Sequence, residues 1–213
     1  MPETGRPIAS LLDVPVTPAD RTPASRGRGE VPPERDLLDR ARRGEPEAFR
    51  VIFDRHSPSV RRFLGDLLRD DAAADEATQE TFVRAHSRMR TLREDERLGG
   101  WLLGIARMVS MEQLRRWRRD PLPLPEEEPR EPDRAPSPEA VLLSGEADRL
   151  LDGALTVLAS DRRAALLMRI DHGLPYEQIA EAMGWNLQKV KNEIHRARLQ
   201  LRERLSGYVE GTP

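Results

Sequence analysis

The sequence contains no cysteine, which excludes disulfide bonds and thiolate metal sites. No apolar run approaches the ~20 residues that a membrane-spanning helix needs. The N-terminus lacks the basic start and the apolar core of a secretory signal peptide. Together these absences predict a soluble, cytoplasmic protein without a membrane span.

The sequence features of an enzyme are missing as well. The histidines His56, His86, His172 and His195 are scattered, and no two of them have the spacing of paired metal ligands. The chain has neither a Gly-rich phosphate loop nor a nucleophile motif. We therefore expect no catalytic residue, no metal and no cofactor, in a protein that is not an enzyme.

Charge is distributed unevenly along the chain. The formal net charge is only −2, so the whole sequence gives no sign of nucleic-acid binding. Residues 186–204, however, carry six basic and two acidic groups, whereas residues 120–139 carry two basic and seven acidic groups. This sorting predicts that different segments meet different partners.

Two Pro-rich stretches divide the chain. Residues 1–34 and 120–138 each contain seven prolines, which exclude regular helix and central strand. We expect a disordered tail (1–34), a helical domain (35–119), a flexible acidic linker (120–139) and a second helical domain (140–208). Strand signals are nearly absent, so the predicted fold class is all-α.

Apolar periodicity predicts four helices in the first domain, over residues 36–43, 46–68, 72–89 and about 99–119. Gly44 ends the first helix, and Pro46 suits the first turn of the second. A break is expected near Ser57–Pro58, because a proline inside a helix removes a hydrogen bond. The fourth helix is expected to bury Trp101, Leu102, Ile105, Ala106 and Val109.

The third helix has two contrasting faces. The first is small and is made of Ala74, Thr78, Thr81 and Ala85. The opposite face, called the ridge below, is made of Glu76, Gln79, Glu80 and Val83. Burial of the small face would leave the ridge outside, either as an ordinary solvated surface or as a surface for a partner.

The fourth helix ends in Leu-Arg-Arg-Trp-Arg-Arg, residues 114–119. Cations at a helix C-terminus complement the helix dipole and need no further explanation. Four arginines around Trp117 also suit contacts with nucleic-acid phosphates. The pattern itself leaves both interpretations open.

Residues 175–204 are the most informative part of the chain. Pro175 and Glu177 suit the first turn of a helix, Gly184 suits its end, and Asn186 is a good N-cap for the next helix. The buried face of that next helix is predicted to hold Leu187, Val190, Ile194, Ala197 and Leu201. This spacing predicts a helix-turn-helix.

The opposite face of the second of these helices carries a polar set: Gln188, Lys189, Lys191, Asn192, His195, Arg196, Arg198 and Arg202. In a helix-turn-helix, the start of this helix enters the major groove, where base pairs can be distinguished. A solvated charged face is the alternative. The coincidence of the motif with positive charge favours DNA binding.

The order of these segments resembles a bacterial sigma factor of the extracytoplasmic-function group, a branch of the sigma-70 family. The resemblance covers about residues 36–119 and 140–206. In the first block it is carried by residues 75–82 (DEATQETF), 101–107 (WLLGIAR) and 114–116 (LRR). In the second block it is carried by residues 176–180 (YEQIA) and 190–198 (VKNEIHRAR).

The resemblance implies a protein that binds core RNA polymerase, directs it to promoters and assists promoter melting. It assigns binding of the polymerase β′ clamp helices to Asp75, Glu76, Gln79, Glu80 and Val83. Promoter DNA would be bound in double-stranded and single-stranded form, and the loop 91–100 would capture single-stranded DNA of the −10 element. The −10 element is further assigned to Arg93, Leu98, Trp101, Arg107, Arg115, Arg116, Arg118 and Arg119. The β flap of the polymerase and an anti-sigma factor are further candidate partners.

The resemblance also assigns the upstream −35 element to the polar set of the second domain. Within that set, Gln188, Lys189, Asn192 and Arg196 are expected at base edges. Phosphate contacts are expected from Lys191, His195, Arg198 and Arg202.

Two other classes of protein remain as alternatives. One is a two-domain transcriptional regulator that binds duplex DNA without polymerase, for which the ridge of the third helix would have no use. The other is a helical adaptor that binds only protein, which leaves the polar residues 188–196 unexplained.

Overall fold

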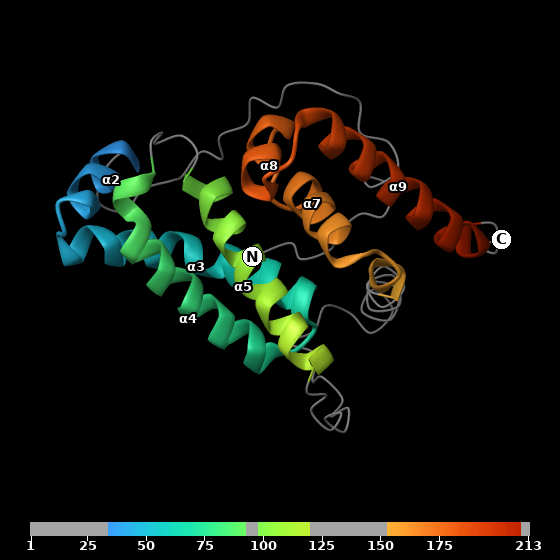
Figure 1. Cartoon of the computed structure of the whole chain (residues 1–213), viewed down its shortest axis with the longest axis horizontal. Helices are drawn as coiled ribbons and strands as arrows, with labels where there is room; N and C mark the ends of the chain where they lie inside the picture. The colour runs from blue at the N-terminus through green and yellow to red at the C-terminus, as the bar shows by residue number, and fades with distance from the viewer. Residues whose placement is uncertain (1–33, 93–97, 120–152, 210–213) are drawn as a thin grey trace, which may run out of the picture.

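The computed structural model describes residues 34–92, 98–119 and 153–209. Within these ranges, all regular secondary structure is helical, which confirms the predicted all-α fold. One domain consists of α2 (Glu34–Arg42), α3 (Pro46–Leu68), α4 (Asp71–Arg88), the 3₁₀ turn η1 (Met89–Thr91) and α5 (Leu98–Arg119). The other contains α7 (Ser160–Ile170), α8 (Tyr176–Met183) and α9 (Leu187–Val209), as Figure 1 shows. The predicted linker (120–139) lies outside the described residues, and so does the predicted tail except for Glu34, which begins α2.

Helix α3 corrects the expectation of a break at Ser57–Pro58. The helix runs without interruption from Pro46 to Leu68, with Pro58 inside it. Pro58 is exposed, whereas Ile52 before it and Val60 and Phe63 after it are fully buried. Burial of both halves of one apolar face therefore offsets the hydrogen bond that the proline removes.

Helix α4 begins at an N-cap, where the Asp70 carboxylate accepts a 2.7 Å hydrogen bond from the backbone N–H of Ala73. The predicted small face is buried, and the Thr78 and Thr81 hydroxyls each donate a 2.7 Å hydrogen bond to a carbonyl one turn earlier. The polar atoms of this face are thus satisfied inside the helix, so α4 packs closely on α3 and α5 while the ridge stays outside.

The second domain follows the predicted helix-turn-helix pattern. Gly184 ends α8 with φ of +63°, a conformation that glycine adopts without strain. The Asn186 side chain accepts a 2.8 Å hydrogen bond from the backbone N–H of Lys189 and caps α9. The predicted buried face of α9 is confirmed except at Leu187, which is 36% exposed because it lies in the first turn, at the edge of the apolar stripe.

The two domains pack against each other, mainly through α5 and α8. A Cβ atom at Gly104 of α5 would lie 3.2 Å from both the Cα atom and the carbonyl oxygen of Ala182 on α8. The Arg107 guanidinium donates hydrogen bonds of 3.0 and 2.7 Å to Asp161 of α7. On the other side of the contact, Ser59 Oγ of α3 lies 3.0 Å from Nδ1 of His172. The two helical units therefore form one closed arrangement (Figure 1).

Candidate nucleic-acid and partner interfaces

The ridge of α4 is exposed as predicted. Glu76 and Gln79 are exposed, Glu80 is partly exposed, and the apolar Val83 is 61% exposed. Asp75, which the resemblance adds to this surface, forms an ion pair with Arg61 of α3. Among the residues that the structure describes, Glu76 has no ion pair, so its carboxylate is available to a partner.

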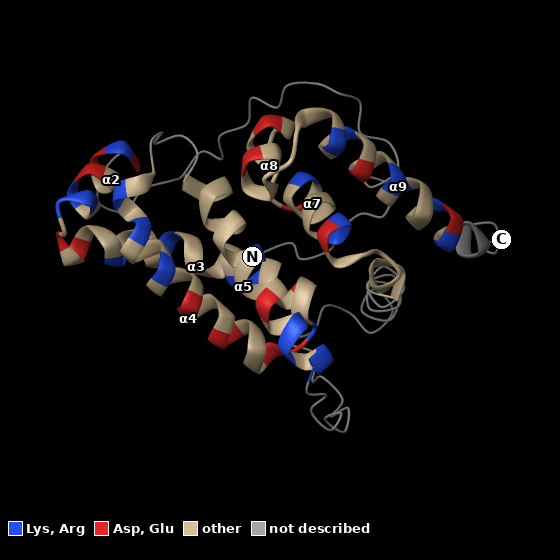
Figure 2. Cartoon of the chain, viewed as in Figure 1, with Lys and Arg blue, Asp and Glu red and all other residues tan. Residues whose placement is uncertain are grey.

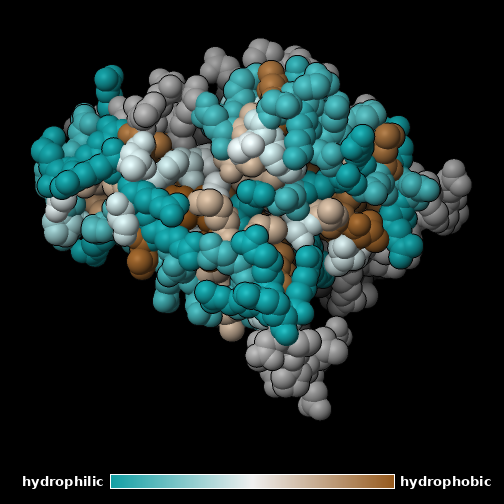
Figure 3. All heavy atoms as spheres, viewed as in Figure 1, coloured by the Kyte–Doolittle hydropathy of each residue, from teal (hydrophilic) through white to brown (hydrophobic). Residues whose placement is uncertain are grey.

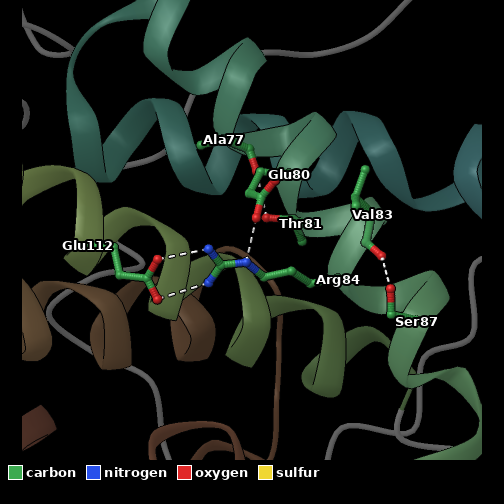
Figure 4. Close-up of polar contacts among 7 residues, drawn as sticks. All are labelled: Ala77, Glu80, Thr81, Val83, Arg84, Ser87 and Glu112. Atoms are coloured by element: carbon green, nitrogen blue, oxygen red, sulfur yellow. Dashed lines mark hydrogen bonds and ion pairs between the residues drawn. The ribbon is translucent and has the colours of Figure 1, made fainter.

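Sequence reasoning missed Arg84, which fixes the ridge to α5. Its Nε donates a 2.6 Å hydrogen bond to Glu80, and its two terminal nitrogens donate bonds of 2.9 and 2.8 Å to the carboxylate of Glu112 (Figure 4). The hydrogen bonds from Arg84 lower the pKa of the Glu112 carboxyl, although burial opposes them. The Glu80–Arg84 spacing of four residues was a signal in the sequence, but the partner on α5 was not.

The residues of α5 that are expected to contact the −10 element differ in how exposed they are. Leu98 is 1% exposed and lies in the core at the start of α5. In this arrangement Leu98 is therefore not accessible to DNA, and its contact with the −10 element stays a prediction. Trp101 is half-buried, and Arg107 is only 17% exposed because Asp161 of the other domain holds it. Arg93 lies outside the described residues.

The arginines at the end of α5 face solvent. Arg115, Arg116, Arg118 and Arg119 are all exposed. Figure 2 shows basic residues at this end of the helix. Within residues 34–92, 98–119 and 153–209, none of these four guanidinium groups forms an ion pair, so they are available to phosphates.

A cleft of about 630 Å³ lies between the two domains. Its lining includes Trp101, Ile105 and Met108 from α5 and Gln178 and Met183 from α8. The half-buried face of the helix expected to meet the −10 element is thus turned toward the other domain in the closed arrangement.

Most of the polar set on α9 is exposed. Gln188, Lys189, Lys191, Asn192, His195, Arg196 and Arg202 are exposed, and Arg198 is half-buried. The Lys189 ammonium lies 4.3 Å from the centre of the Trp185 ring, a cation–π contact that steadies it. The Gln188 amide donates a 3.0 Å hydrogen bond to Asn192, so these two candidate base-reading side chains support each other.

The surface around these sites is mainly polar. On the face shown in Figure 3, hydrophobic residues lie in small separate groups among hydrophilic ones. No group of His, Asp and Glu side chains that could hold a metal ion occurs within the described residues. None of the described helices is both long and apolar enough to cross a membrane. The described surfaces can therefore bind partners through polar and charged groups.

Comparison with known protein families gives two matches in chain order. Residues 52–120 match the family described as sigma-70 region 2, and residues 148–201 match the family described as sigma-70, region 4. The two matched segments together span more than half of the chain. They include the ridge, helix α5 and the helix-turn-helix.

Curated relatives are named as sigma factors. The chain is 32% identical to the ECF RNA polymerase sigma factor SigE of Mycolicibacterium smegmatis over 158 residues, which cover 74% of this chain and 61% of that protein. It is 29% identical to the RNA polymerase sigma-H factor of Pseudomonas aeruginosa, over 78% of this chain and 90% of that protein. The chain thus spans less than two thirds of one relative and most of the other.

A solved structure has the same fold. The sigma factor RpoE of Bartonella quintana, determined in complex with the anti-sigma factor NepR, superposes with a TM-score of 0.60 at 25% sequence identity. The match covers 74% of this chain and 96% of that chain. On the two family matches, the relatives and the shared fold, this chain belongs to the sigma-70 family, in its extracytoplasmic-function group.

Proposed function

We propose that this chain is a sigma factor that binds core RNA polymerase, directs it to promoters with particular −10 and −35 elements, and assists promoter melting. The observation that carries the proposal is the occurrence of both sigma regions in order along the chain. Each region has exposed residues on its candidate binding surface. The activity is one of binding and positioning, performed by the protein without chemistry of its own. A protein with this function, which acts on core polymerase, would be located in the cytoplasm.

The domain of residues 35–119 would hold the polymerase clamp through the ridge, with Glu76, Gln79 and Val83 as its exposed contacts. Asp75 and Glu80 would act partly through their internal pairs with Arg61 and Arg84, which set the shape of the ridge. The domain of residues 140–208 would read the −35 element with the exposed start of α9.

Helix α5 would bind the −10 element through Trp101, Arg107 and its C-terminal arginines. Extraction of a base from the stack costs a few kcal/mol, which an enclosing pocket and stacking on an aromatic ring recover. Trp101 at the edge of a cleft suits stacking. Because Asp161 now holds Arg107, this arginine would become available only after the domains separate.

Promoter binding requires that separation. The names of the two elements place them about 25 base pairs apart, or ~85 Å along B-DNA at 3.4 Å per base pair. The 33 residues of 120–152 can span at most ~120 Å, so the connection is long enough. An anti-sigma factor, as found with the Bartonella quintana protein, is a proposed partner that would act on this opening.

Co-purification with bacterial core polymerase, followed by run-off transcription, tests the proposal. A sigma factor should bind core and start transcripts at defined promoters. A regulator of the alternative class would bind duplex promoter DNA and leave core polymerase unbound. Failure to bind core would therefore refute the proposal and favour that alternative.

A further inference from the structure

A hydrogen-bonded chain of three residues links α7 to the exposed face of α9. Arg162 Nε of α7 donates a 2.7 Å hydrogen bond to one carboxylate oxygen of Glu193 on α9. The other oxygen of Glu193 accepts a 3.0 Å hydrogen bond from a terminal nitrogen of Arg196. Arg162 is itself held by a second bond, of 2.8 Å, to the Gln200 side chain. Each member of the chain therefore has a defined place.

The first two residues of this hydrogen-bonded series are largely buried, and the third is exposed. The side chains of Arg162 and Glu193 are 21% and 16% exposed, whereas that of Arg196 is 62% exposed. The hydrogen bond from Arg162 lowers the pKa of the Glu193 carboxyl, with burial opposing and Arg196 adding to the effect. Glu193 is thus an ionised group, anchored inside and facing one exposed arginine.

We propose that Glu193 is a positioning residue for promoter reading: fixed from α7 by Arg162, it holds the Arg196 guanidinium in the orientation that reads a base pair. The proposal rests on the proposed function, because it needs α9 to bind the −35 element. Neither Glu193 nor Arg162 belongs to the set expected to read bases, and Arg162 lies on α7, which does not enter the groove.

The physical reason is the length of the arginine side chain. A free arginine loses rotational freedom when it binds, and its planar fork reads guanine only in the correct orientation. An arginine already held by a fixed carboxylate loses less freedom, so more of its hydrogen bonding appears as preference for the correct base. The negative charge also restrains Arg196 from collapsing onto a neighbouring phosphate.

A second role for Glu193 can be separated from this one. A carboxylate in the major groove can itself accept a hydrogen bond from cytosine. Both carboxylate oxygens of Glu193 are already engaged, by Arg162 and by Arg196. The geometry therefore favours positioning over direct reading, and the two roles predict different base pairs.

The test uses the full chain bound to core polymerase and competition among −35 elements that differ at single base pairs. Arg196→Ala identifies the base pair that Arg196 reads. Glu193→Gln and Arg162→Met should each reduce discrimination at that same base pair by about tenfold, as expected for loss of a charged hydrogen bond. Adding Glu193→Gln to Arg196→Ala should cause no further loss.

Controls separate positioning from charge and from folding. Glu203→Gln removes the same charge from an exposed site on α9 and should leave discrimination unchanged. Arg162→Lys keeps the charge at α7 and should restore part of the discrimination. The salt dependence of binding should match the native protein, because no phosphate contact has been removed. Circular dichroism at the assay temperature checks that each variant is folded.

Unchanged discrimination in Glu193→Gln, with a clear effect of Arg196→Ala, would overturn the positioning role alone. Loss at a different base pair would also overturn it and would show that Glu193 reads a base directly. Absence of any −35 preference in the native holoenzyme would overturn the proposed function together with this inference.

Discussion

Replacement of Gly104 by alanine should weaken the packing of the two domains while strengthening the helix that carries it. The new Cβ would lie 3.2 Å from the Cα atom and the carbonyl oxygen of Ala182, closer than the ~3.5–4.0 Å of an ordinary carbon contact. These are backbone atoms of α8, so the whole helix has to move by a few tenths of an ångström.

The expected magnitude has two parts of opposite sign. Overpacking of this kind costs ~1–3 kcal/mol, which lowers the ratio of closed to open protein by about 5- to 150-fold. Within α5, exchange of glycine for alanine favours the helix by ~1 kcal/mol. We therefore expect the first domain to unfold at the same or a higher temperature while the domains separate more often.

Gly65 in α3 provides a matched control. It is also a helical glycine, but a Cβ atom there would meet no atom within 4 Å. Gly65→Ala should stabilise its helix and leave the domain contact unchanged.

Energy transfer between two dyes measures the separation of the domains. Because the chain has no cysteine, Arg55→Cys in α3 and Arg204→Cys in α9, both at exposed positions, give two specific labels. Gly104→Ala should lower the transfer efficiency and Gly65→Ala should not. Equal efficiencies in the two variants would refute the inference that this close contact maintains the closed arrangement.

Three further predictions concern the first domain. Glu76→Lys combined with Gln79→Ala should abolish core polymerase binding in pull-down assays. Because both side chains are exposed, the circular dichroism spectrum should not change. Normal binding by this variant would show that the polymerase interface lies elsewhere on the protein. Replacement of residues 93–97 by a Gly/Ser segment should spare core binding and −35 recognition but prevent melting, so that permanganate footprinting finds unreactive thymines and a premelted template restores transcripts. Glu112→Gln should reduce the free energy of unfolding at neutral pH but not at low pH: the Glu112 pKa is lower in the folded protein, so its contribution is present above the ordinary glutamate pKa and lost as the pH falls through the folded value. A constant difference between native and Glu112→Gln proteins across that pH range would count against the Arg84–Glu112 pair.

Features set by neighbouring residues could be predicted from the sequence. The small face of α4, the exposed ridge and the turn at Gly184 follow from spacing and from the conformational freedom of glycine. The same local reasoning failed at Pro58, where packing on both sides outweighs the lost hydrogen bond. The burial of Leu98 was not predicted either, since the family resemblance placed this residue at the −10 element.

The ion pairs that organise the sites could not be predicted, because they join residues distant in sequence. Arg84 and Glu112 are 28 residues apart, Arg162 and Glu193 are 31 apart, and Arg107 and Asp161 are 54 apart. The sequence shows that each is charged, but only the packing of the helices decides which charges meet. Of the six, only Arg107 belonged to the set of residues predicted to bind.

Helix α5 has two mutually exclusive uses in the proposed function. Its Trp101 and Arg107 face the other domain now and would face the −10 element on a promoter. The contact that holds them includes an ion pair with Asp161, which is 46% exposed, and such half-solvated pairs contribute little net free energy. An ion pair that contributes so little suits a protein that has to open under the proposed function, because core polymerase would bind both domains and would gain from their linkage. The free energy of binding the two domains at separate sites would then have to exceed the packing of α5 on α8, to which this ion pair adds little.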